Sequence, residues 1–322
     1  MQTPVPTTPP GVPFTSRYYT STDGLRLHYR DYAGPPNARL TVVCIPGLTR
    51  NARDFEEVAP HLADRYRVIC VELRGRGLSE YAKDPMTYVP AVYVRDIISL
   101  LDSAGLERVA LIGTSLGGII SMVLATVVPA RLLGVVINDI GPELDPVGLA
   151  RIGSYVGRTK EIRDWSEAAA AIAAIDGVVF PEYTGEDWLR MARRRFVETQ
   201  AGTLKADYDT DISKPFVATA KAVNLWPFFR SFRLLPVLAL RGGHTDLLSV
   251  DIFERMQTEV PHLKRVTVPN RGHAPYLDEP EARQAIDAFL DSLPATIGPL
   301  TALKRKIVAA ATVVRLKLKG EI

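Results

Sequence analysis

The chain has 322 residues, of which 47% are hydrophobic, and a formal net charge of +3. This length and apolar content are enough for one large core with an inserted subdomain. The small charge, and the lack of a basic stretch interleaved with aromatic residues, argue against a nucleic-acid-binding protein. No apolar run reaches the roughly 18 residues that a membrane span requires, so we expect no span.

Residues 1–14 are rich in proline and are predicted to be a disordered N-terminal segment. They lack the charged start and following apolar stretch of a secretory signal. The chain has two cysteines, Cys44 and Cys70, each inside an apolar run that is typical of a buried strand. Buried free thiols and the absence of a signal favour a cytoplasmic protein.

Apolar runs of strand length then alternate with helical patterns, which predicts a parallel sheet covered on both faces. The first two strands flank the turn Asp23-Gly24 and form a hairpin. Strands are expected at 18–20, 25–30, 40–45, 66–71, 109–113, 133–138, 236–241 and 264–268, with helices at 55–62, 88–106 and 280–293. This order predicts an α/β fold with a mostly parallel eight-stranded sheet that starts antiparallel.

Between Asn138 and Pro236 the alternation stops, and helical patterns remain at 167–175 and 188–196. An unstructured loop of this length would be unusual, so we expect an inserted helical cap over the sheet. The predicted organisation starts with a disordered segment (1–14) and the first part of the core (15–141). The helical cap (142–235), the second part of the core (236–295) and a C-terminal extension (296–322) follow.

The extension 296–322 holds six Lys or Arg residues against one acidic residue. Its large aliphatic residues and one alanine recur at helical spacing, while Val313 and Leu316 interrupt the stripe. The stripe consists of Leu300, Leu303, Ile307, Ala311, Val314 and Leu318. The pattern favours a helix docked on the body or a solvated tail. The alternative is a basic amphipathic element in weak contact with an anionic membrane surface through residues 300–319.

The most informative motif is Gly113-Thr-Ser115-Leu-Gly117-Gly118, between an apolar strand and a helical run. A strand that turns sharply into a helix at a serine exposes the hydroxyl on strained backbone, where neighbouring side chains must be small. The N–H of Leu116 then lies at a helix N-terminus, where it stabilises a developing oxyanion. The alternative is an ordinary serine N-cap. We favour Ser115 as a nucleophile.

A serine nucleophile needs a base, and His273 follows the last predicted strand in a glycine-flanked loop. We expect the other histidines to have packing or surface roles. The base in turn needs an acidic partner. Asp246 follows the seventh strand and completes the chain order serine, acid, histidine, so we expect it in this role. Asp139, after the sixth strand, is the alternative acid.

The second oxyanion donor is expected from the loop after the third strand, where Gly47 allows the backbone to turn and Leu48 offers its N–H. Cap aromatics are predicted to line an apolar substrate pocket, the alternative being that they pack the cap on the core: Trp188, Trp226 and Phe228. The run Arg193–Arg195 is interpreted as an exposed charged surface, with a carboxylate-binding role as the alternative.

Taken in order, these residues resemble the α/β-hydrolase superfamily, and within it the small bacterial serine esterases and lipolytic hydrolases with a helical cap. The resemblance covers about residues 16–295 and rests on Pro46-Gly47, Glu72–Ser79, Gly113–Gly118, the Asp246 loop and Gly272-His273. It implies a triad of Ser115, Asp246 and His273, with no cofactor and no metal. The chain departs from many relatives in having Ile45-Pro46-Gly47 where they have His-Gly.

The sequence therefore predicts a carboxylesterase-like enzyme that cleaves small-molecule carboxylic esters through an acyl-enzyme. Some similar bacterial esterases also cleave aliphatic polyesters. Two alternatives remain: a hydrolase of carbon–carbon bonds or lactones that uses the same triad, and a ligand-binding protein on a hydrolase scaffold with vestigial activity. Fold alone does not choose among them.

Overall fold

A computed structural model describes residues 13–158, 161–218 and 224–318. The predicted disorder of residues 1–14 therefore lies almost wholly outside the described residues. Of that segment, Phe14 packs its ring against Tyr32, with ring centroids 5.4 Å apart.

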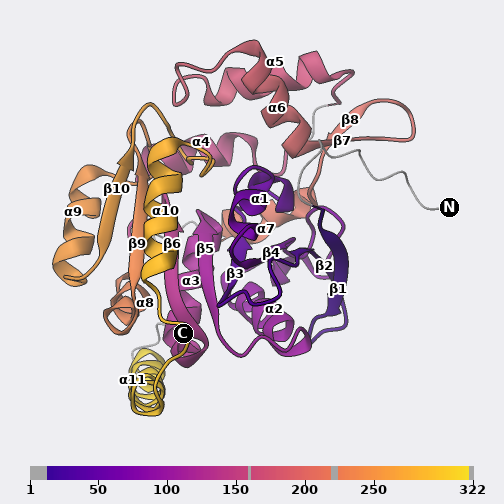
Figure 1. Ribbon diagram of the computed structural model, residues 1–322. Helices are drawn as coiled ribbons and strands as arrows, with labels where there is room; N and C mark the ends of the chain where they lie inside the picture. The colour runs from indigo at the N-terminus through magenta and orange to yellow at the C-terminus, as the bar shows by residue number, and fades with distance from the viewer. Residues whose placement is uncertain (1–12, 159–160, 219–223, 319–322) are drawn as a thin grey trace.

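The core is an eight-stranded sheet with strand order β1-β2-β4-β3-β5-β6-β9-β10 (Figure 1). Strand β2 pairs antiparallel with β1 and β4, and all other neighbouring pairs in this sheet are parallel. Its strands are β1 (Thr15–Thr20), β2 (Arg26–Tyr32), β3 (Thr41–Ile45), β4 (Arg67–Val71), β5 (Val109–Thr114), β6 (Leu132–Asn138), β9 (Val237–Gly242) and β10 (Lys264–Val268). The predicted α/β fold, with its antiparallel start, is confirmed.

Helices cover both faces of this sheet because successive strand residues point to opposite sides. In β3, for example, Val43 and Ile45 pack in one apolar layer and Val42 and Cys44 in the other. The first layer includes α2 (Pro90–Ser103), α3 (Leu116–Val127) and α9 (Val250–Glu259), and the second includes α1 (Val58–Ala63) and α10 (Pro280–Ser292). Short 3₁₀ helices are η1 (Ala52–Phe55), η2 (Pro85–Thr87), η3 (Pro129–Arg131), η4 (Thr210–Ile212) and η5 (Arg230–Leu234).

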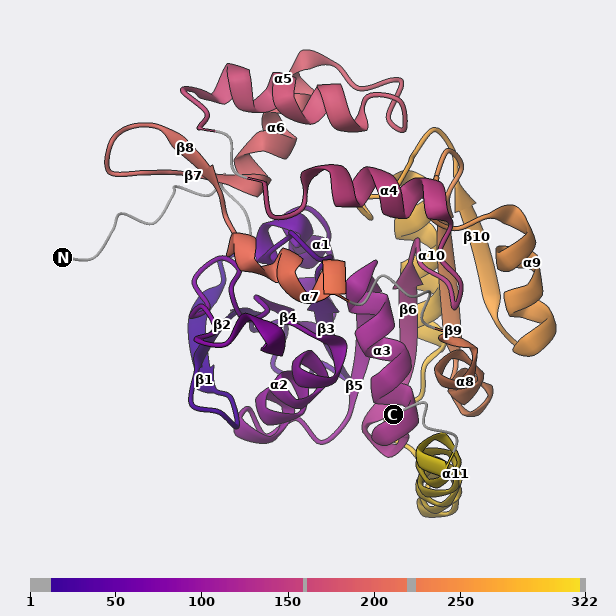
Figure 2. The ribbon, with the colours of Figure 1, turned by 180° about the vertical axis from the view of Figure 1, so that it is seen from behind.

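The segment between β6 and β9 is largely helical, and its first three helices lie beyond the carboxyl ends of the strands (Figure 2). Its elements are α4 (Pro146–Tyr155), α5 (Trp165–Asp176), α6 (Gly185–Arg195), β7 (Phe196–Glu198), β8 (Leu204–Ala206), α7 (Ser213–Ala218) and α8 (Trp226–Phe229). Helices α5 and α6 enclose a small apolar cluster of their own. The β7–β8 hairpin was not predicted, because three-residue strands are too short to show an alternating pattern.

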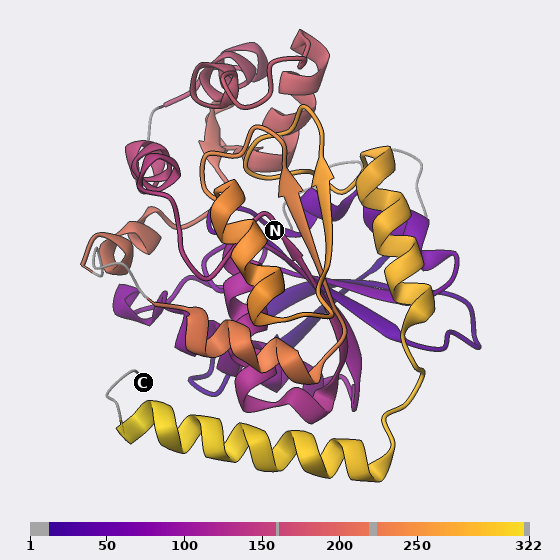
Figure 3. The ribbon, with the colours of Figure 1, turned by 90° about the vertical axis from the view of Figure 1, so that its left-hand side faces the viewer.

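The C-terminal extension forms one helix, α11 (Pro299–Leu318), at the opposite end of the molecule from α5 and α6 (Figure 3). It packs against α3 and η3. Leu316, which interrupts the sequence stripe, is buried together with Ala309. The buried guanidinium of Arg305 donates a hydrogen bond of 2.7 Å to the carbonyl of Leu132. None of the described helices is long and apolar enough to cross a bilayer.

We predict that Leu316→Ala detaches α11, because a fully buried leucine loses about 2–5 kcal/mol of packing when it is truncated. Tryptic cleavage within 299–318 should become faster than in the unaltered protein. The matched control is Val314→Ala, two residues away, whose side chain is 57% exposed. Equal cleavage rates in the two variants would contradict the packing of α11 described here.

Candidate active site

The turn between β5 and α3 holds Ser115 with φ +53° and ψ −114°, a left-handed conformation that non-glycine residues rarely adopt. The chain can turn sharply here because glycines lie two residues before and two residues after Ser115. A Cβ on Gly113 would lie 2.3 Å from the carbonyl oxygen of Gly117, and a Cβ on Gly117 would lie 2.1 Å from that of Ile45. The two glycines therefore permit the sharp turn that presents the serine hydroxyl.

His273 follows β10 and faces this hydroxyl. Its Nε2 lies 2.9 Å from Ser115 Oγ, in hydrogen-bond range, and its side chain is 8% exposed. In the neutral tautomer with the proton on Nδ1, Nε2 accepts the serine proton. The structure thus brings the serine and the histidine within hydrogen-bond distance of each other.

The carboxylate that meets the imidazole belongs to Asp139, at the end of β6. Its Oδ2 lies 2.9 Å from His273 Nδ1, and its Oδ1 accepts a 2.8 Å hydrogen bond from the N–H of Gly242. Asp139 is fully buried, and its φ of +55° turns the side chain beneath the histidine. Both oxygens are thus held by donors, which fixes the carboxylate for orienting the imidazole.

The expectation that Asp246 contacts His273 is wrong in this structure. Arg151 of α4 binds Asp246 with two hydrogen bonds, from Nε at 2.6 Å and from a terminal nitrogen at 2.8 Å. Burial raises the pKa of Asp246, but the hydrogen bonds and charge of Arg151 outweigh this effect and lower the pKa below its ordinary value. Asp246 anchors the helix α4 to the core, and the alternative acid, Asp139, takes the place beside the histidine.

The predicted oxyanion loop after β3 lies against the nucleophile turn. A Cβ built on Gly47 would be 3.6 Å from the Cβ of Ser115. The carbonyl of Leu48 accepts hydrogen bonds from two nitrogens of the buried Arg76, at 3.0 and 2.8 Å. This contact fixes the peptide between Leu48 and Thr49, which adjoins the peptide that carries the N–H of Leu48. Within the described residues, neither the N–H of Leu48 nor that of Leu116 has a hydrogen-bond partner.

A cavity of about 1330 Å³ opens over these groups and is lined by Ser115, His273, Leu48 and Leu116. Most of its remaining lining is aliphatic and aromatic, from α3, α4 and the segment around α8. Two of the three predicted pocket aromatics, Trp226 and Phe228, contribute to it. The third, Trp188, does not line this cavity.

Trp188 instead packs inside the cluster between α5 and α6, with its ring centroid 6.4 Å from that of Phe180 and 5.1 Å from that of Tyr183. The apolar face of α6 is directed at α5 and not at the cavity, which is the physical reason for this difference. The sequence could not show whether Trp188 faces the cavity or α5, because burial against either one produces the same helical period of apolar residues.

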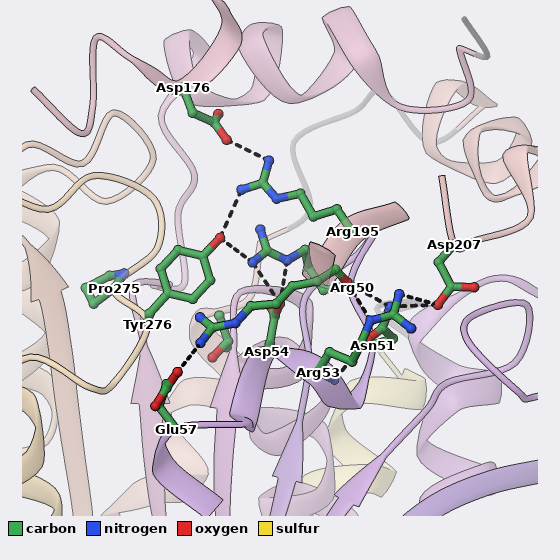
Figure 4. A network of polar contacts seen from close by, with 12 residues as sticks. Arg50, Asn51, Arg53, Asp54, Glu57, Asp176, Arg195, Asp207, Pro275 and Tyr276 are labelled. Atoms are coloured by element: carbon green, nitrogen blue, oxygen red, sulfur yellow. Dashed lines mark hydrogen bonds and ion pairs between the residues drawn. The ribbon is translucent and has the colours of Figure 1, made fainter. Parts of the chain in front are cut away.

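One wall of the cavity is strongly polar (Figure 4). The hydroxyl of Tyr276, three residues after His273, accepts hydrogen bonds from Arg50 and, at 3.2 Å, from Arg195. Asp54 binds Arg50 at 2.8 Å, and Asp176 binds Arg195 at 2.7 Å. Two guanidinium groups therefore meet at one phenol oxygen in the wall of the cavity that also contains the candidate nucleophile.

Behind this wall, further ion pairs continue the polar network from the core to the segment between β6 and β9 (Figure 4). Arg53 binds Asp207 at 2.7 Å, and Arg194 binds Glu57 at 3.0 Å. In the sequence analysis Arg50 and Tyr276 received no role. Their positions in the sequence could have indicated a role, because each lies within three residues of a predicted site residue, Leu48 or His273. The part of the chain that the structure describes contains no cluster of three or more potential metal ligands.

Residues 42–285 match the Alpha/beta hydrolase family, and the chain belongs to this family. It is 35% identical over 264 residues to a 3-hydroxybutyrate-oligomer hydrolase of Cupriavidus necator, and the matched region covers 79% of this chain and 89% of that protein. It is 28% identical to a 2-(acetamidomethylene)succinate hydrolase of Mesorhizobium japonicum, over 76% of this chain and 86% of that protein. The protein is thus a hydrolase with bacterial relatives.

Among solved structures, an alpha/beta hydrolase from Novosphingobium aromaticivorans is 47% identical, with a TM-score of 0.82 over 86% of this chain and 98% of that one. The structure of E-2-(acetamidomethylene)succinate hydrolase is 25% identical, with a TM-score of 0.73 over 87% of this chain and 100% of that one. These similarities extend across the sheet and the helical segment above it.

We predict that Asp139→Asn lowers kcat by about 10⁴-fold, the loss typical of an amide that holds the histidine in the wrong tautomer. Asp246→Asn should keep most of the turnover, because Asp246 contacts Arg151 and not the imidazole. Steady-state kinetics on a p-nitrophenyl ester compares the two variants. A larger loss from Asp246→Asn would show that we have assigned the wrong acid.

The Asp246→Asn variant should instead lose stability in a pH-dependent way. A carboxyl group whose pKa is lowered in the folded state stabilises it above the unfolded pKa of about 3.9, and this contribution disappears as the pH falls through the folded value. The melting temperatures of the variant and the unaltered protein should therefore differ near neutral pH and converge in acid.

Proposed function

We propose that this hydrolase cleaves carboxylic esters through an acyl-enzyme intermediate. The proposal rests chiefly on one observation, the continuous chain of two 2.9 Å hydrogen bonds from Ser115 through His273 to Asp139 at the floor of the cavity. A serine hydroxyl becomes an effective nucleophile when an adjacent, oriented base removes its proton.

In the proposed reaction, Ser115 Oγ bonds to the ester carbonyl carbon as its proton passes to His273 Nε2. The backbone N–H groups of Leu48 and Leu116 bind the oxyanion of the tetrahedral intermediate. The carbon–oxygen bond to the alcohol then breaks, and the imidazolium protonates the leaving oxygen. Water, deprotonated by His273, then attacks the acyl carbon, the bond from this carbon to Ser115 Oγ breaks, and the imidazolium returns its proton to Oγ as the acid leaves. Asp139 keeps the imidazole oriented and stabilises its charged form in both halves.

We further propose that the preferred esters carry a free carboxylate, as an oligomer of a hydroxy acid does at one end. Arg50 and Arg195 lie in the wall of the cavity that also contains the candidate nucleophile, and guanidinium groups pair well with carboxylates. The Cupriavidus relative acts, by its name, on 3-hydroxybutyrate oligomers, and the Mesorhizobium relative on a substituted succinate. The apolar remainder of the cavity suits the aliphatic part of such a substrate.

Ser115→Ala should lower kcat on a p-nitrophenyl ester by roughly 10⁴–10⁶-fold, because the covalent step is lost. The melting temperature should be unchanged, since the alanine keeps the Cβ and removes only the hydroxyl. Burst kinetics with the unaltered protein should show one equivalent of released alcohol per site. Turnover near the original rate in the alanine variant would exclude the acyl-enzyme.

The charged wall is tested with Arg195→Gln, assayed on the 3-hydroxybutyrate dimer and on the methyl ester of that dimer. A lost charged hydrogen bond of about 1.5–3 kcal/mol corresponds to a rise in KM of about 10–100-fold for the acid, with little change for the methyl ester. The control is Arg193→Gln, an exposed arginine of the same run. An equal effect on both substrates would assign Arg195 a structural role only.

A further inference from the structure

The helix α11 has two apolar faces, and the body of the protein covers one of them. Arg305, Ala309 and Leu316 are buried against α3 and η3. The opposite face exposes five large aliphatic residues at spacings of three, four or seven, so that they form one stripe along the helix. These residues and their exposed fractions are Leu300 84%, Leu303 55%, Ile307 60%, Val314 57% and Leu318 84%.

Basic side chains flank this stripe on both sides. At about 100° per residue, Lys304 and Arg315 lie on one border, and Lys306 and Lys317 lie on the other. All four are exposed, and among the described residues none of them has an ion-pair partner. Helix α11 contains no acidic residue. The outward face is therefore an apolar stripe between two cationic borders.

We propose that this outward face of α11 binds an anionic lipid bilayer, with the helix axis parallel to the membrane plane. Large aliphatic side chains of a helix that lies in the interface enter the acyl boundary, while flanking lysines and arginines contact the anionic headgroups. Apolar residues exposed as one contiguous stripe mark an interaction surface, whereas scattered ones do not. Positive charge on both borders favours an anionic surface and opposes pairing with a second, identical stripe.

The docking of α11 also fixes the orientation of the bound protein. Because α11 lies at the opposite end from α5 and α6, the helical segment over the cavity would face away from the lipid (Figure 3). Substrates would then reach the cavity from the aqueous side. The proposal does not depend on the reaction catalysed, and membrane binding should leave turnover of a soluble ester unchanged.

The test is co-sedimentation of the full chain with vesicles of pure phosphatidylcholine and with vesicles that contain about 30% phosphatidylglycerol. We expect binding to the anionic vesicles, weak binding to the neutral ones, and release at about 1 M salt, where charges are screened within about 3 Å. Replacement of the four basic residues by glutamine should weaken binding about fivefold per charge removed.

A double variant, Leu303→Glu with Ile307→Glu, should abolish binding, while the control Val250→Glu, at an exposed valine of α9, should not. Melting temperature and ester turnover show that each variant is folded. The proposal would be overturned if the unaltered chain did not bind vesicles or if the double variant bound them equally well. It would also be overturned if the unaltered chain formed a dimer without binding vesicles and the double variant were monomeric.

Discussion

The backbone of β3 touches the nucleophile turn at Gly117, where the carbonyl oxygen of Ile45 occupies the space that a Cβ would need. This contact sets the distance between the loop that follows β3 and the helix that follows Ser115. The N–H groups of Leu48 and Leu116 are on these two segments, so one close backbone approach places both beside the serine. Any side chain at position 117 would separate them, which makes the glycine a requirement of the site as well as of the turn.

The sheet and most of its helices were predictable, because strands buried on both faces produce continuous apolar runs and the helices between them keep a regular period. The serine and the histidine were predictable for a related reason. Each lies in a glycine-containing loop at the carboxyl end of a strand, the edge at which open α/β sheets bind ligands.

The choice of the acid was not predictable in the same way. Asp139 and Asp246 both follow strands at the same edge, and chain order favoured Asp246. The outcome depends on Arg151, which lies on a helix remote in sequence and takes both oxygens of Asp246. It also depends on the left-handed backbone at Asp139, a conformation that aspartate tolerates better than most residues. Neither feature is visible in the local pattern.

The arginine-rich wall adds polar contacts to the apolar ones, such as that of Phe180 with Tyr276, between the helical segment and the loop after β10. Asp176 accepts hydrogen bonds from Arg151 and Arg195, and Arg195 contacts Tyr276, which belongs to the loop that carries His273. The helical segment above the sheet is thus connected to the loop that carries His273 by directional, charged contacts. Such contacts hold the pocket in one geometry more strictly than apolar packing alone would.

Arg76 holds the loop after β3, which carries the proposed oxyanion donor Leu48. Its guanidinium lies fully buried, bonded to Tyr93 and to two backbone carbonyls, one of which is that of Leu48. The peptide between Leu48 and Thr49 is therefore held in place when the chain folds. It adjoins the peptide that carries the N–H of Leu48, so in the proposed reaction this loop would need little reordering with each substrate. Dipoles that are already aligned before charge develops lower the reorganisation energy of a reaction. In the proposed reaction, Arg76 would thereby contribute to the rate although it does not line the cavity.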